Sequence, residues 1–196
     1  MKYLTVGTKN IREEEFRKIE DTDFKNSMKP VGGMWFTEFD NHLKNYNSWV
    51  DFMLSRPYLL FYKSQLRNDN PFVQPCSVVS LKSDINLYVL HNDQTLDYLM
   101  KCFPKNGKFS YEDLSNYYDG IYVNLHNLFL GKYDMNVLKK FSSFDVSSLV
   151  LFNLDCIDYY QSGDVFIDPF DYESGVEFPE GYEIKINDVK KKILKK

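Results

Sequence analysis

The chain has 196 residues, of which 43% are hydrophobic and 17% aromatic, so it is long and apolar enough to bury a core. Its formal net charge of −4 at pH 7, with acids spread along the chain, does not favour nucleic acid as the partner. The three cysteines lack a Cys-x-x-Cys spacing, so they predict neither disulfides nor a metal site. No segment fits a membrane span or a signal peptide. We therefore expect a cytoplasmic protein.

The first half of the chain predicts three strands and one helix. Residues 2–8 alternate polar and apolar side chains as half-buried strands do, and a second strand is predicted at 32–39, starting at the glycine pair. The charged stretch 10–24 between them predicts a short helix or a solvated loop. In residues 45–55, apolar side chains recur at offsets of three and four, the spacing of an amphipathic helix. Residues 58–64, YLLFYKS, predict the third strand.

The rest of the chain, from residue 76 on, adds five strands and three helices. Asn92 or Asp93 can cap a helix over 94–103, and Ser110 opens a shorter helix over 111–118. Strands are predicted at 76–83, 85–90, 120–125, 147–153 and 182–186, and a basic terminal helix at 187–196. Strands outnumber helices without a regular βαβ alternation, so we predict an α+β fold with mainly antiparallel sheets in one domain over all 196 residues.

Several common chemistries have no motif in this sequence. His42, His91 and His126 are far apart, and none lies in an HExxH pattern or beside a GxSxG nucleophile signature. Neither a P-loop motif nor a Rossmann GxGxxG occurs, so phosphate binding by these loops has no support. Zinc hydrolases, triad hydrolases and proteins with either loop are therefore not expected.

Three short stretches remain as candidates for a functional site. In the first, KPVGGMWFT at residues 29–37, Gly32 and Gly33 allow either a tight turn or the close approach of a ligand. Trp35 and Thr37 fall on one face of the strand that follows. The structural alternative is a glycine turn with Trp35 in the core.

The other two stretches each place an acid at the head of a strand. In YYDGIYV, Asp119 and Gly120 precede an apolar strand, where a plain Asp-Gly turn explains the pattern as well as an active-site carboxylate does. In FDVSSLVLFN, Asp145 stands before two serines. Its structural alternative is the end of strand pairing or the cap of a neighbouring turn.

Together with the Gly-Thr that ends the first predicted strand, these stretches resemble the strand core of the ADP-ribosyltransferase superfamily. The resemblance implies two small antiparallel sheets, split by a cleft that holds NAD. The three stretches also resemble a group of bacterial and phage proteins of unassigned role with KPxGGLW, DYDG and WDVxS motifs. Val6 stands where the superfamily has a His or Arg, so Thr5 or Lys9 would have to take over that contact with NAD.

The resemblance implies a role for each candidate residue. A carboxylate beside the ribose stabilises the oxocarbenium-like state as the nicotinamide bond breaks, and Asp119 holds this role ahead of Asp145. The implied NAD contacts are stacking of the nicotinamide on Trp35, amide contacts at Gly32 and Gly33, a ribose hydroxyl at Thr37, and a phosphate at Lys29.

Three functions follow as hypotheses. The first is an ADP-ribosyltransferase that uses NAD to modify a protein or nucleic acid, as a bacterial or phage effector. The second is a non-catalytic protein of the same fold that binds or inhibits a host or defence protein, and the third is an enzyme that hydrolyses NAD without transfer. The acids and aromatics of residues 156–183 predict a face for a basic protein partner, unless the aromatics fold onto the sheet and the acids merely face water.

Overall fold

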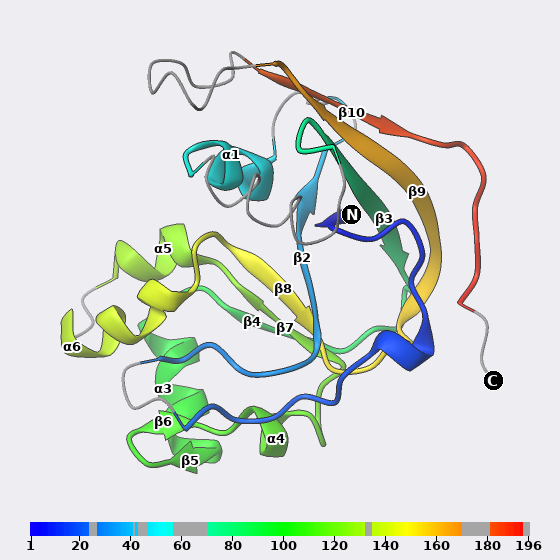
Figure 1. Ribbon diagram of the computed structural model, residues 1–196. Helices are drawn as coiled ribbons and strands as arrows, with labels where there is room; N and C mark the ends of the chain where they lie inside the picture. Colours follow the sequence, from blue (N-terminus) through cyan, green and yellow to red (C-terminus); the bar gives the residue numbers. More distant parts are fainter. Residues whose placement is uncertain are drawn as a thin grey trace. The chain divides into compact units, whose positions relative to one another are not determined.

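The computed structural model describes residues 1–23, 27–40, 42, 47–56, 70–131, 135–169 and 181–193 (Figure 1). Backbone packing divides the chain into two compact units. Unit 1 comprises Met1–Arg12, Thr37–Leu81 and Ile157–Lys196, and unit 2 comprises Glu13–Phe36 and Lys82–Cys156. The single domain that we predicted stays a prediction beside this division.

Unit 1 is built on antiparallel strands. Its elements are β1 (Lys2–Val6), the second half of β2 (Met34–Phe39), α1 (Ser48–Leu54), β3 (Val73–Leu81), β9 (Ile157–Ile167) and β10 (Tyr182–Ile186). The strands are hydrogen-bonded in the order β10-β9-β3-β1-β2. The side chain of Asn47 caps α1 by accepting from the amides of Trp49 and Val50, and the helix adds Val50 and Met53 to the core of the unit.

Unit 2 combines a mixed sheet with short helices. Its strands are the first half of β2, β4 (Leu87–Leu90), β5 (Pro104–Lys105), β6 (Lys108–Phe109), β7 (Gly120–Val123) and β8 (Ser148–Leu151). Its helices are η1 (Glu13–Glu15), α3 (Asp93–Cys102), α4 (Tyr111–Leu114), α5 (Leu125–Phe129), α6 (Met135–Leu138) and η2 (Lys139–Ser143). The main strands are ordered β2-β8-β7-β4, and the β5–β6 hairpin lies beside α3 (Figure 1).

The α+β prediction is confirmed, but the sheets differ from those that we expected. The hydrogen-bonded order β10-β9-β3-β1-β2-β8-β7-β4 makes one eight-stranded sheet, and the parallel pair β4–β7 makes that sheet mixed. The prediction of mainly small antiparallel sheets is therefore wrong. The physical reason lies in β2, which pairs with β1 through residues 37–39 and with β8 through residues 34–36, so that one ladder continues into the next.

Local patterns located several elements well. The strand predicted at 182–186 coincides with β10, and the helix predicted at 94–103 is α3 with a shift of one residue. Of the two possible caps for this helix, Asn92 is the one used. Its side chain accepts from the amide of Thr95, and the Thr95 hydroxyl accepts from the amide of Asn92, which completes a capping box.

Other predictions at the chain's ends and loops differ from the structure. The helix predicted at 187–196 is wrong for its described part, because residues 187–193 form no helix and Lys191 instead pairs with Tyr160. The strand predicted at 58–64 lies outside the described residues. In the part of the chain that the structure describes, no helix is long and apolar enough to cross a membrane.

Strand β9 accounts for much of the segment in which we expected a partner-binding face. This strand pairs with β3 along one edge and with β10 along the other. Tyr160 and Ile167 are buried, whereas Phe166 is 37% exposed. Residues 170–180 of the segment lie outside the described part of the chain, and the partner stays a prediction.

Candidate functional site

The glycine pair of the first candidate stretch packs against other parts of unit 2. Gly32 and Gly33 have φ angles of +77° and +66°, in the left-handed region that favours glycine. A Cβ atom on Gly32 would lie 2.1 Å from the carbonyl oxygen of Lys18, and a Cβ atom on Gly33 would lie 2.8 Å from Cγ1 of Val150. Protein atoms therefore fill this space, which gives both glycines a role in the backbone.

Next to this turn, residues from two of the candidate stretches come together. We call Lys29, Trp35, Phe144 and Asp145 the tryptophan cluster. The indole Nε1 of Trp35 donates to the carbonyl oxygen of Gly32 at 3.0 Å, and its ring lies 5.3 Å from that of Phe144 between centroids. Nζ of Lys29 lies 4.9 Å from the indole centroid and 3.6 Å from Oδ2 of Asp145. The side chains of Lys29 and Asp145 are 36% and 26% exposed, so solvent reaches the charged side of the cluster.

Asp119 is held by hydrogen bonds to its neighbours in unit 2. Its Oδ2 accepts from the amide of Asn86 at 2.9 Å, and its Oδ1 accepts from Nδ2 of Asn153 at 3.1 Å. Its own amide donates to the carbonyl oxygen of Asn86, and its carbonyl oxygen accepts from the amide of Phe152, both at 2.8 Å. The half-buried side chain therefore ties together the segments next to β4, β7 and β8.

The two candidate acids do not share a site. Asp119 directly precedes β7, whereas Asp145 lies just before β8. Because β7 and β8 are antiparallel, the start of one strand lies at the end of the other. Asp119 and Asp145 therefore lie at opposite ends of this strand pair.

The remaining predicted NAD contacts belong to unit 1. Thr5 lies on β1 opposite Ser77 of β3. Thr37 is only 3% exposed, and its hydroxyl donates to Oδ1 of Asn47 at 3.2 Å. Lys9, the alternative to Thr5, forms an ion pair of 2.7 Å with Asp164. Thr37 and Lys9 thus have partners within unit 1.

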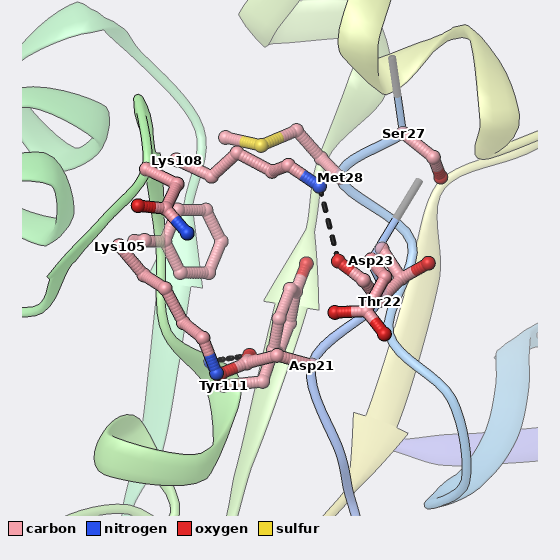
Figure 2. Close-up of a pocket in the computed structure, with 10 residues that line it drawn as sticks. Asp21, Thr22, Asp23, Ser27, Met28, Lys105, Lys108 and Tyr111 are labelled. Carbon is pink, nitrogen blue, oxygen red and sulfur yellow. Dashed lines mark hydrogen bonds and ion pairs between the residues drawn. The ribbon is translucent and has the colours of Figure 1, made fainter. Parts of the chain in front are cut away.

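A cavity that the sequence did not suggest lies in unit 2. It has a volume of about 320 Å³, and Figure 2 shows the side chains around it. The lining residues come from two segments, namely Asp21, Thr22, Asp23, Ser27 and Met28 from one and Lys105, Asn106, Lys108, Phe109 and Tyr111 from the other. We call this space the Tyr111 cavity.

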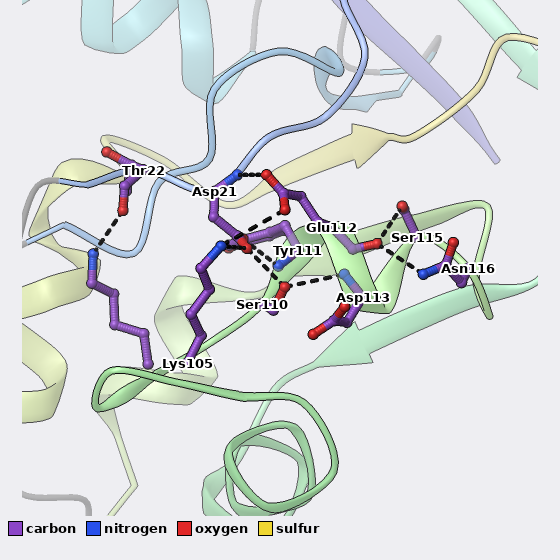
Figure 3. A network of polar contacts seen from close by, with 10 residues as sticks. Asp21, Thr22, Lys105, Ser110, Tyr111, Glu112, Asp113, Ser115 and Asn116 are labelled. Carbon is purple, nitrogen blue, oxygen red and sulfur yellow. Dashed lines mark hydrogen bonds and ion pairs between the residues drawn. The ribbon is translucent and has the colours of Figure 1, made fainter.

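Asp21 anchors one wall of the Tyr111 cavity (Figure 3). Its side chain is 8% exposed and accepts from Nζ of Lys105 at 2.8 Å, from Oγ of Ser110 at 2.7 Å and from the amide of Tyr111 at 2.5 Å. Burial acts to raise the pKa of Asp21, but the hydrogen bonds from Lys105, Ser110 and Tyr111 outweigh it and lower the pKa below the usual 3.8. The carboxylate is therefore ionised, and both of its oxygens accept hydrogen bonds from the protein.

Tyr111 contrasts with Asp21. Its side chain is buried at 3% exposure, and its hydroxyl has no hydrogen-bond partner among the described residues. Burial, followed by the negative charge of Asp21, raises the pKa of Tyr111 well above its usual value, so the hydroxyl stays protonated. In Figure 2 this hydroxyl points into the space enclosed by the lining side chains.

Lys108 supplies a positive charge on the other side of the cavity. Its Nζ donates to the carbonyl oxygen of Thr22 at 3.1 Å (Figure 2). Burial, followed by the positive charge of Lys140, lowers the pKa of Lys108. The negative charges of Asp21 and Asp23 act in the opposite direction, so charges of both signs surround Lys108.

Within unit 2 the structure thus brings together Lys29, Gly32, Trp35 and Asp145, and it holds Asp119 elsewhere. The Tyr111 cavity escaped sequence reasoning because its lining residues lie about eighty positions apart and form no motif. The one local signal was Ser110, which caps α4 by accepting from the amide of Asp113 as expected. In the described residues, no group of three or more His, Cys, Asp or Glu side chains is arranged to hold a metal ion.

Comparisons with protein-family models, with curated protein sequences and with solved structures find no match for this chain.

Proposed function

We propose that this chain is an ADP-ribosyltransferase that uses NAD, and that the tryptophan cluster is its catalytic site. The observation that carries the proposal is the meeting of Lys29, Trp35 and Asp145, which come from two stretches more than one hundred residues apart. The resemblance of the same stretches to the ADP-ribosyltransferase superfamily supports the choice of chemistry.

The chemistry requires three kinds of group, and the cluster contains one of each. The bond between nicotinamide and ribose C1′ breaks, nicotinamide leaves with the electron pair, and an acceptor nucleophile bonds to C1′ and loses its proton. A carboxylate next to the ribose stabilises the positive charge that develops during this step, and Asp145 would provide it. Lys29 would attract the diphosphate, and the indole of Trp35 would offer an aromatic surface to the ring.

The proposal assigns the acid role to Asp145 rather than to Asp119. Both carboxylate oxygens of Asp119 accept hydrogen bonds from the protein, which ties this side chain to the fold. Asp145 instead lies 3.6 Å from Lys29, the residue that we expect to meet a phosphate. An acid close to the phosphate-binding cation is better placed to act on the attached ribose.

Nicotinamide release from NAD tests this assignment. Asp145→Asn should lower the rate by about a hundredfold or more, because it removes the negative carboxylate charge that stabilises the transition state. Asp84→Asn is the matched control, since Asp84 is an exposed acid of the same unit and should leave the rate unchanged. Equal rates for Asp145→Asn and wild type would contradict the proposal. Labelled ADP-ribose on a macromolecule distinguishes transfer from simple hydrolysis of NAD.

The second candidate is a non-catalytic protein that binds or inhibits a host or defence protein. Large apolar side chains exposed on unit 2 favour it, because such side chains mark interaction surfaces when they gather. Phe129, Leu130 and Met135 at the end of α5 and the start of α6 are 45%, 73% and 63% exposed. Calorimetry with NAD separates the candidates, since wild-type protein that binds no NAD would leave only the second.

A further inference from the structure

Strand β4 is the last strand at one end of the sheet, and its outer edge is open. It pairs in parallel with β7 and with no other strand of the described residues. The carbonyl oxygens of Asn86 and Leu90 accept hydrogen bonds on the β7 side. Alternate residues of a strand direct their backbone groups to opposite edges, so those of Leu87 and Val89 face the open edge. Nδ1 of His91 lies 3.3 Å from the carbonyl oxygen of Val89, which leaves the Val89 N–H and both backbone groups of Leu87 for another chain.

The open edge of β4 lacks the charges that commonly protect edge strands. β10, at the other end of the strand order, carries such charges on Glu183 and Lys185, which form an ion pair of 3.0 Å. β4 reads LYVL, and the side chain of Val89 is 44% exposed. An apolar edge of this kind is suited to an added strand from an extended peptide.

Exposed aromatic rings adjoin this edge. The ring of Tyr88 in β4 stacks on that of Tyr98 in α3 at 5.8 Å between centroids and meets that of Tyr118 edge-on at 5.3 Å. Phe103, at the end of α3, lies 6.4 Å from Tyr98 and 5.6 Å from Tyr117 between centroids. We call these five rings the tyrosine rim. Tyr98 and Tyr117 are 46% and 68% exposed, and exposed tyrosines are favoured at protein interfaces.

The charge of unit 2 indicates what kind of partner fits this surface. Unit 2 contains 15 Asp and Glu against 11 Lys and Arg, a net charge of −4, whereas unit 1 contains 13 of each. Acids also outnumber bases among the exposed charged residues of α3, α4 and the turn before β4, which are Asp84, Asp97, Glu112, Asp113, Lys82 and Lys101. Two copies of an acidic unit repel each other, whereas a basic partner is attracted, and arginine stacks well on tyrosine rings.

We propose that the open edge of β4 and the tyrosine rim bind an extended, basic segment of a partner protein. The segment adds a strand beside β4 through backbone hydrogen bonds with Leu87 and Val89. Its cationic side chains lie against the rings of Tyr98 and Tyr117. This surface shares no residue with the tryptophan cluster, and the inference does not rest on ADP-ribosyl transfer.

Fluorescence anisotropy with a labelled peptide of alternating arginine and valine tests the proposal on the full chain. The peptide should bind the wild-type protein, and added salt should weaken its binding. The same peptide with its central backbone amides N-methylated should bind about tenfold more weakly or worse, because it cannot pair with a strand edge. A peptide of alternating glutamate and valine should not bind.

Variants of Tyr117 test the contribution of the rim. Tyr117→Ala should lower the affinity for the arginine peptide about tenfold, and Tyr117→Phe should bind as the wild type does because it keeps the ring. Val189→Ala is the matched control, since Val189 is an apolar side chain of unit 1 with a similar exposure of 65%. Circular dichroism of each variant verifies its fold.

Several results would overturn this surface. These are no binding of the arginine peptide, equal affinity of the N-methylated peptide because charge alone drives binding, and equal affinity in Tyr117→Ala and wild type. A loss in Val189→Ala as large as that in Tyr117→Ala would also contradict the proposal. A dimer in analytical ultracentrifugation that Tyr117→Ala dissociates would assign the surface to a second copy of the chain instead.

Discussion

The tryptophan cluster and the Tyr111 cavity lie in the same unit and use their polar groups in opposite ways. In the cluster, the indole nitrogen of Trp35 is bonded to Gly32, and Lys29 lies beside both the ring and Asp145. In the cavity, the hydroxyl of Tyr111 is buried without a partner among the described residues. The polar groups of Lys29 and Trp35, in the most conspicuous motif of the sequence, thus have partners within the protein. Tyr111, which no motif marks, instead has a hydroxyl donor without a partner in the described residues.

Among the variants that test this comparison, substitution of Gly32 should destabilise the protein most, because the carbonyl oxygen of Gly32 accepts the hydrogen bond of Trp35 in the cluster. In Gly32→Ala the Cβ would meet the carbonyl oxygen of Lys18 at 2.1 Å in a backbone conformation with φ of +77°. We expect the free energy of unfolding in urea to fall by roughly 3 kcal/mol or more, from strain and overpacking together.

Gly107→Ala is the matched control for this substitution. Gly107 has a similar φ of +73°, but among the described residues its Cβ would meet only Nζ of Lys140 at 3.8 Å. Strain alone should then cost about 1 kcal/mol. Equal losses for the two variants would mean that the contact with Lys18 contributes nothing.

Asp21→Asn should cause the next largest loss of stability, because Asp21 accepts three hydrogen bonds in one wall of the cavity. It weakens hydrogen bonds from Lys105, Ser110 and Tyr111, and we expect a loss of about 1–3 kcal/mol in the free energy of unfolding at pH 7. Asp23→Asn is the control, because the neighbouring Asp23 is exposed and should change stability little.

The pH dependence of the same variant follows from the lowered pKa of Asp21. Burial opposes this lowering, but the hydrogen bonds to the ionised carboxylate outweigh it. The carboxylate therefore contributes its full stability above the usual pKa of 3.8, and this contribution is lost as the pH falls through the lower pKa of the folded state. The stability difference between wild type and Asp21→Asn should be constant near neutral pH and shrink below about pH 4. A difference that grows on acidification would reverse the sign and contradict this account.

Trp35→Phe should have the smallest of these effects. It keeps an aromatic ring against Phe144 but removes the hydrogen bond of 3.0 Å to Gly32, which is worth about 1 kcal/mol. Trp49→Phe is the control, since the indole nitrogen of Trp49 makes no hydrogen bond within the described residues and its ring stacks on Phe52. Thermal unfolding of both variants measures the difference. If Trp49→Phe is as destabilising as Trp35→Phe, the indole hydrogen bond has no net value.

The sequence predicted the candidate site only in part. It pointed to Lys29, Trp35 and Asp145, which the structure brings together, but also to Asp119, which lies at the other end of β7 and β8. Each residue stood out through its local motif. A motif cannot show which end of a neighbouring strand it will meet, because that depends on pairing between distant segments.

The sequence by itself determined the elements that depend on near neighbours. Asn92 and Thr95 cap α3 from three positions apart, and the alternation of residues 182–186 locates β10 without reference to any partner. These features follow from hydrogen bonds and side-chain periodicity within a few residues.

Only the tertiary structure decided the strand order and the Tyr111 cavity. β9 has no clean alternation, because residues 160–163 are buried in succession and so lie on both faces of the strand. Its partners β3 and β10 come from distant parts of the sequence. The cavity arises where the segment of Asp21 and Met28 meets that of Lys105 and Tyr111. Neither segment has a sequence pattern that predicts its contact with the other. Long-range pairing and packing fix such features, since their free energy comes from contacts that exist only after distant parts of the chain have met.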